Sequence, residues 1–123
     1  MLRNKGVANK KETIFIEDIV DAGNNITKKG DCPVELVTLD DISEPVTCIK
    51  MDIEGAEKDA LYGAKNHIIN EKPKLLISAY HVPEDMFDIP KLIADMRDDY
   101  VLYLRFNGEP GLIWSCDYVL YAL

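Results

Sequence analysis

The stretch IKMDIEGAE, Ile49 to Glu57, places two carboxylates, Asp52 and Glu54, next to Gly55, where an apolar run changes into a helical pattern. Further along the chain, His81 follows a second apolar run. Carboxylates and imidazoles accept protons, bind hydroxyl groups and hold divalent cations. These residue types therefore indicate acid–base or binding chemistry, provided that the fold brings them together.

The elements that must position them are predicted from hydrophobic periodicity. Apolar and β-branched runs predict strands, and apolar residues at three- and four-residue spacing predict helices. The order from Val46 onward is strand, helix, strand, helix, strand, strand. Such alternation predicts an α/β fold with a parallel sheet, closed by an antiparallel hairpin at its edge. The expected strands cover 46–53, 74–80, 100–106 and 117–123, and the expected helices cover 55–69 and 88–97.

In parallel sheets, ligands bind outside the carboxyl ends of the strands. Asp52 and Glu54 follow the first of these strands, His81 follows the second, and Arg105 lies near the end of the third. We expect these groups at one rim, with Asp52, Glu54 and His81 as the candidate catalytic residues. Lys50 and Arg105 are the candidate substrate-binding residues. The sequence assigns no metal ligands, because two carboxylates alone are a weak metal signal.

Simpler structural roles account for each residue taken singly. Asp52 or Glu54 could cap the following helix, and Glu54 precedes Lys58 by the spacing of a helical ion pair. Gly55 could serve only close packing. The strand from Val46 is apolar almost throughout, as in a strand buried on both faces, so Lys50 is expected to pair with an acid such as Asp52.

His81 alone is more often a hydrogen-bonded structural residue, and Arg105 alone is more often a surface or ion-paired residue. The coincidence of Asp52, Glu54, His81 and Arg105 at one rim favours a functional site.

The N-terminal region differs in character. Residues 1–12 are polar and are expected to be frayed, whereas 13–16 and 34–39 read as strands that could pair. The turn-rich stretch 21–33 lies between them. We therefore expect one domain of two parts, an N-terminal hairpin and insertion region over 1–45 and an α/β core over 46–123.

Composition limits the partners. The chain has 123 residues, with 14 basic and 22 acidic side chains and a net charge of −8. This charge argues against nucleic acids and anionic membranes as partners, since both require a positive field. The three cysteines are scattered and lack metal-type spacing. The sequence shows no signal peptide and no apolar run of membrane length. These features predict a cytoplasmic protein with reduced thiols.

Several motifs together resemble a known family. They are VTLDDI (37–42), IKMDIEGAEKDALYGA (49–64), KPKLLISAYHVPEDMFDIP (72–90), YVLYLRF (100–106) and YVLYAL (118–123). They resemble the C-terminal half of the FkbM methyltransferases, which use S-adenosylmethionine and often methylate hydroxyl groups of sugars or polyketides.

The resemblance implies a Rossmann-like class I methyltransferase sheet, of which this chain would supply the fourth to seventh strands. In that fold the tip of the fourth strand borders the site of methyl transfer. The matching positions are Asp52 and Glu54, with His81 at the next tip. Asp52 or His81 could take the proton of a small-molecule hydroxyl acceptor, and Glu54 could orient the acceptor or His81. The choice between Asp52 and His81 stays open.

The cofactor-binding residues remain unassigned. Class I methyltransferases bind S-adenosylmethionine mainly through their first two strands, and IVDAGNNI (19–26) only imitates the family's cofactor loop. The stretch after it is too short for a crossover helix, and Thr27 replaces the closing glycine. The chain is therefore expected to be a fragment that is inactive alone. It is also expected to self-associate, to pair with a complementing N-terminal half, or to be covered by its own N-terminal hairpin.

Two alternatives differ in class. The chain could be a non-catalytic α/β module that acts by association through an exposed strand edge, or a small metal-dependent hydrolase that uses Asp52, Glu54 and His81.

Overall fold

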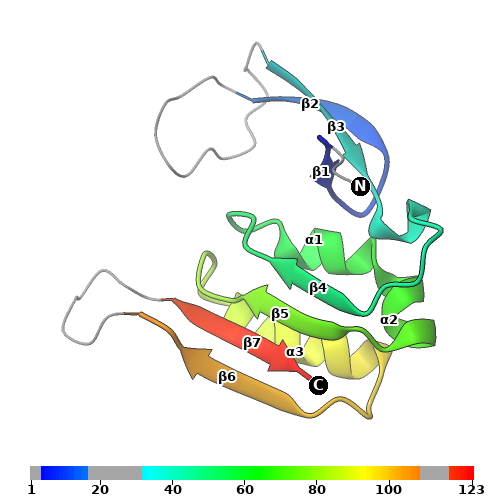
Figure 1. Ribbon diagram of the computed structural model, residues 1–123. Coiled ribbons are helices and arrows are strands. Elements are labelled where there is room, and N and C mark those ends of the chain that lie inside the picture. Colours follow the sequence, from blue (N-terminus) through cyan, green and yellow to red (C-terminus); the bar gives the residue numbers. More distant parts are fainter. Residues whose placement is uncertain (1–3, 17–31, 109–116) are drawn as a thin grey trace.

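The computed structural model describes residues 4–16, 32–108 and 117–123. The described residues form two sheets and three α-helices (Figure 1). The elements are β1 (Gly6–Val7), β2 (Glu12–Ile16), β3 (Cys32–Val37), the 3₁₀ turn η1 (Leu39–Asp41), β4 (Cys48–Met51), α1 (Glu57–Tyr62), α2 (Lys65–Glu71), β5 (Lys74–Ser78), α3 (Asp85–Met96), β6 (Leu102–Phe106) and β7 (Tyr118–Ala122).

The larger sheet has the strand order β4-β5-β7-β6. Strands β4 and β5 are parallel, and β7 runs antiparallel to both of its neighbours. The mixed α/β class is therefore as expected, and so is the antiparallel hairpin at the edge, which β6 and β7 form. Within this hairpin β7 lies next to β5, and β6 is the outermost strand.

One face of this sheet carries the core. Alternate residues such as Met51, Leu75 and Ile77 point to that face and are buried. Helices α1 and α3 pack on the same side, as Figure 1 shows. The opposite face is only partly covered among the described residues. Its cross-strand row runs through Lys50, Leu76, Tyr121 and Tyr103, all half-buried or exposed.

The expectation of a strand buried on both faces at 46–53 was therefore wrong. Strand β4 is shorter, and its burial alternates. Lys50 points to the open face and is exposed, and no ion pair joins it to Asp52 in the described part of the chain. Its ammonium group stays in water, so it needs no buried partner.

The single helix expected over 55–69 is two helices, broken at Gly63. A β-carbon at Gly63 would lie 2.0 Å from the carbonyl oxygen of Ala8, so the glycine lets the N-terminal segment touch this turn. Asp40, in the LDD motif, accepts hydrogen bonds from the backbone N–H groups of Asn66 and His67 at the start of α2. These long-range contacts break the helical pattern at a point that periodicity alone does not mark.

The expected ion pair between Glu54 and Lys58 is also absent among the described residues. Lys58 contacts Asp85 and Asp88 at 3.0 Å instead, which ties α1 to α3. These two carboxylates hold the pKa of the Lys58 ammonium above its usual range. Helix α3 begins at Asp85, with Glu84 at its N-cap, rather than at Asp88. It thus starts directly after the loop that carries His81.

The N-terminal strands form a separate sheet of order β1-β3-β2. Strands β2 and β3 pair antiparallel, as expected for 13–16 and 34–39. Residues 1–12 were expected to be frayed, yet Gly6–Val7 pair in parallel with Leu36–Val37. The side chain of Asn9 donates to Asp59 on α1, so this sheet adjoins α1 (Figure 1). The turn-rich stretch 21–33 lies largely outside the described residues.

None of the helices within the described ranges has the length and apolar composition that a bilayer crossing requires.

Candidate functional site

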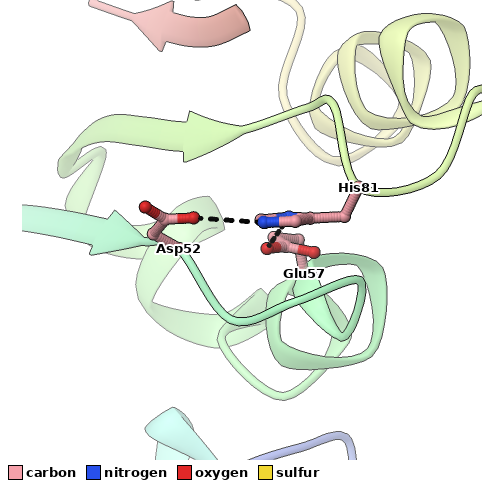
Figure 2. A group of neighbouring side chains, drawn as sticks. All are labelled: Asp52, Glu57 and His81. Carbon is pink, nitrogen blue, oxygen red and sulfur yellow. Dashed lines mark ion pairs between the residues drawn. The ribbon is translucent and has the colours of Figure 1, made fainter. Parts of the chain in front are cut away.

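The candidate site forms where β4 and β5 end at the same edge of the sheet. Asp52 follows β4 directly, and Met51 pairs with Ile77 near the end of β5. The chain continues from β5 to His81, whose imidazole turns back toward Asp52 (Figure 2). Parallel pairing thus places two groups at one edge although they are far apart in the sequence.

A sharp turn follows β4 and positions the carboxylates of Asp52 and Glu54. Glu54 has φ 57° and Gly55 has φ 95°, both in the left-handed region that favours glycine. A β-carbon on Gly55 would lie 3.3 Å from Val82 and 3.8 Å from the Cβ of His81. Gly55 therefore allows the turn to pack against the loop after β5. Neither Asp52 nor Glu54 caps α1, which begins at Glu57 with Ala56 at its N-cap.

The imidazole of His81 is surrounded by three carboxylates. Its Nε2 atom lies 3.4 Å from Oδ1 of Asp52 and 3.6 Å from Oε2 of Glu54. Its Nδ1 atom lies 3.1 Å from Oε1 of Glu57. The side chain of His81 is 10% exposed, whereas those of Asp52 and Glu54 are 44% and 49% exposed. The site is thus a buried imidazole whose outer acids face solvent.

Glu57 is the residue that the sequence prediction missed. Its side chain is fully buried, and Oε1 accepts a hydrogen bond from the backbone N–H of Ile53 at 2.9 Å. Glu57 shares the helical face of Ala60, Leu61 and Ala64, which are buried in the core. An acid on the apolar face of a helix was the available signal, because buried carboxylates are rare unless they are paired or functional.

Tyr80 supports the outer part of the site. Its hydroxyl donates to Oδ1 of Asp52 at 3.2 Å, and its ring lies 4.2 Å from the His81 ring between centroids. Burial, together with the Asp52 carboxylate, raises the pKa of the Tyr80 phenol to about 12. Tyr80 is therefore a neutral donor at physiological pH, and it orients Asp52 rather than accepting a proton itself.

Three of these residues could hold a metal ion. One ligand atom each from Asp52, Glu57 and His81 lies within 4.8 Å of the others (Figure 2). Glu54 is not a member of this group, although its Oε2 atom approaches the same nitrogen, Nε2 of His81, at 3.6 Å.

The structure does not bring Lys50 or Arg105 into the cluster. Lys50 lies on the open face of β4, and Arg105 lies on β6, at the far side of the strand order. The guanidinium of Arg105 stands 5.9 Å from the ring centroid of Tyr121. No described hydrogen bond or ion pair connects either residue to Asp52, Glu54 or His81. Their substrate-binding role stays a prediction without geometric support.

The fold and the site define a mixed α/β protein with a carboxylate–imidazole cluster at the carboxyl ends of parallel strands. The model of the methyltransferase FkbM domain family matches residues 4–110. The chain belongs to this family, which confirms the resemblance found in the sequence.

A solved structure points the same way. The crystal structure of methyltransferase FkbM from Methylobacillus flagellatus KT is similar to the whole of this chain, with 32% sequence identity and a TM-score of 0.78. The chain spans 28% of the length of that protein. Among proteins with curated descriptions, no match was found.

Proposed function

We propose that the Asp52–Glu57–His81 cluster is the proton-accepting part of a methyl-transfer site. The methyl donor would be S-adenosylmethionine, and the acceptor a hydroxyl group of a sugar or a similar metabolite. The observation that carries this proposal is the placement of His81 between Asp52 and Glu57, at the shared end of β4 and β5, in a methyltransferase family member. The sheet would be part of a larger Rossmann-like sheet, consistent with the order β4-β5-β7-β6.

The chemistry of hydroxyl methylation suits this cluster. The hydroxyl oxygen attacks the methyl carbon, an O–C bond forms, and the C–S bond breaks to release S-adenosylhomocysteine. The hydroxyl proton passes to Nε2 of His81 or to the carboxylate of Asp52, which is partly exposed to solvent. If His81 takes the proton, Glu57 stabilises the resulting imidazolium from the buried side. The negative cluster also favours the approach of a cationic sulfonium.

The activity of a complete enzyme is part of this proposal, because the chain spans 28% of the length of its structural neighbour. We expect this chain alone to bind S-adenosylmethionine weakly and to transfer no methyl group. Calorimetry with S-adenosylmethionine should compare this chain with one extended upstream in its gene. Micromolar binding by the short chain would contradict our proposal that it lacks part of the cofactor pocket.

Site variants test the catalytic assignment. The assay follows transfer of labelled methyl groups to a panel of sugar and polyketide alcohols, and it uses whichever of the two chains is active. In that chain, we expect Asp52→Asn and His81→Gln each to lower kcat by at least about 10²-fold. Asp95→Asn, at an exposed position on α3, is the matched control and should leave the rate unchanged. Full activity in both site variants would refute the assignment.

A second function is favoured by the free edge of β4. Within the described residues, β4 pairs with β5 on one side and with no strand on the other. A groove of about 470 Å³ runs along it, and apolar residues including Leu39, Val46 and Ile53 line it. Such an edge could pair with a second chain. Sedimentation equilibrium should then show association that Val46→Lys weakens, and a monomer at all concentrations would exclude this function.

A further inference from the structure

Two polar atoms in the centre of the cluster lack hydrogen-bond partners. Oε2 of Glu57 and Nδ1 of His81 are both buried, and neither has a hydrogen-bonding partner among the described residues. Nδ1 lies 3.1 Å from Oε1 of Glu57, which is an ion-pair distance, but the pair is not aligned as a hydrogen bond. Buried polar atoms are normally satisfied, so an unsatisfied pair at one point indicates a missing ligand.

Charge leads to the same conclusion. Asp52, Glu54 and Glu57 surround one imidazole, and within the described chain no lysine or arginine forms an ion pair with any of them. The nearby ammonium of Lys58 is engaged by Asp85 and Asp88. A single imidazolium cannot neutralise three carboxylates, and an uncompensated buried carboxylate is strongly unfavourable. A further cation would compensate this charge.

We propose that Asp52, Glu57 and His81 bind one divalent transition-metal cation of the Mn²⁺ or Zn²⁺ type. Two carboxylates and one imidazole nitrogen suit these ions, whereas Mg²⁺ and Ca²⁺ prefer oxygen ligands alone. Three protein ligands leave an open position, as in catalytic metal sites. With such a cation bound, Asp52 and His81 would serve as ligands instead of proton acceptors, and the cation would lower the pKa of a hydroxyl group that reached the open position.

The distances fit such an ion. Metal–ligand bonds of about 2.0–2.1 Å in a tetrahedral site separate the ligand atoms by about 3.4 Å. Oδ1 of Asp52 and Nε2 of His81 already stand 3.4 Å apart, and one ligand atom from each of the three residues lies within 4.8 Å of the others. Asp52 is partly exposed, so a cation could reach it from solvent.

The surrounding contacts would hold the ligands in place. Oε1 of Glu57 accepts the N–H of Ile53, which leaves Oε2 available. Tyr80 donates to Asp52, in the way that outer hydrogen bonds commonly orient metal ligands. Glu57 thus has one oxygen engaged by the fold and one buried oxygen without a hydrogen-bonding partner among the described residues.

Cation binding is measurable without substrate, so it stands or falls independently of methyl transfer. After treatment with a chelator, this chain should be titrated with Mn²⁺ alone and Zn²⁺ alone by calorimetry. We expect one saturable site. Electron spin echo spectroscopy of bound Mn²⁺ should show coupling to an imidazole nitrogen.

Variants locate the site. Asp52→Asn removes an exposed ligand without opening the core and should weaken binding at least tenfold. His81→Gln should abolish the nitrogen coupling, whereas His67→Gln should retain it, since His67 is the other histidine of the chain. Asp95→Asn should bind like the unaltered chain. The proposal is overturned if neither ion binds saturably, or if Asp52→Asn binds both with unchanged affinity.

Discussion

Nδ1 of His81 lies 3.1 Å from Oε1 of Glu57, a carboxylate with no solvent exposure. The two residues lie in different loop-and-helix segments, and the contact joins the start of α1 to the loop after β5. The same Oε1 atom accepts the N–H of Ile53. Glu57, the first residue of α1, therefore links the turn after β4 to the imidazole of His81.

Substitution of Glu57 should separate its structural role from its charge. Glu57→Ala leaves the N–H of Ile53 without its acceptor and should lower the free energy of unfolding by about 1–3 kcal/mol. Glu57→Gln keeps that hydrogen bond and removes a buried charge, so the metal-free chain should be as stable as the original or more stable. Urea unfolding of the three proteins measures this order. A glutamine variant less stable than the alanine variant would contradict it.

Gly55 should be intolerant of a side chain. Its φ of 95° strains any L-residue, and a β-carbon would press on Val82 at 3.3 Å. We expect Gly55→Ala to cost about 1–2 kcal/mol of stability and to displace the turn from His81. Thermal unfolding gives the stability change. The His81 ring resonances in NMR spectra report the displacement, and unchanged resonances would show that the turn does not position the imidazole.

Gly63 should be essential for the contact between the end of α1 and the N-terminal segment around Ala8. A β-carbon there would lie 2.0 Å from the carbonyl oxygen of Ala8, so the N-terminal segment would have to move away. Gly63→Ala should cost roughly 1–3 kcal/mol through this overpacking. Hydrogen exchange tests the location of the effect: the amide of Ala8, which donates to Val37, should lose protection. Protection equal to that of the original chain would show that the contact is dispensable.

His67 should give the chain a pH-dependent stability near neutrality. Burial opposes the charged imidazole, but the hydrogen bond to Glu71 and further polar contacts hold its pKa above the usual 6.5. A histidine with a raised pKa in the folded state stabilises the fold fully below pH 6.5, and this contribution disappears as the pH rises through the folded-state pKa.

Glu71→Gln tests this linkage. The amide oxygen can still accept the N–H of Val46, but the negative charge beside His67 is lost. We expect NMR titration to show a lower pKa for His67, and stability to fall more at pH about 6 than at pH about 8. Glu84→Gln, at an exposed position, is the control. An unchanged titration midpoint in Glu71→Gln would refute the pairing.

Part of the fold and of the site follows from local patterns. The apolar runs of β4 and β5 and the helix between them predict parallel pairing, and this pairing places Asp52 and His81 at one edge. The break between α1 and α2 at Gly63 could not be predicted from local patterns, because it depends on Ala8 and Asp40, which are distant in sequence. Arg105 was expected at the same edge, but the insertion of β7 between β5 and β6 moves it farther across the sheet.

The sequence by itself determined the family, the alternation of strands and helices, and the two outer acids of the candidate site. Each of these depends on residue types at short spacing, where the chain's own geometry decides. The tertiary structure alone decided that Glu57 meets His81, and that Oε2 of Glu57 and Nδ1 of His81 have no hydrogen-bond partner among the described residues. Both facts depend on how α1 packs against the loop after β5, and no local pattern encodes the distance between two segments that only the folded core brings together.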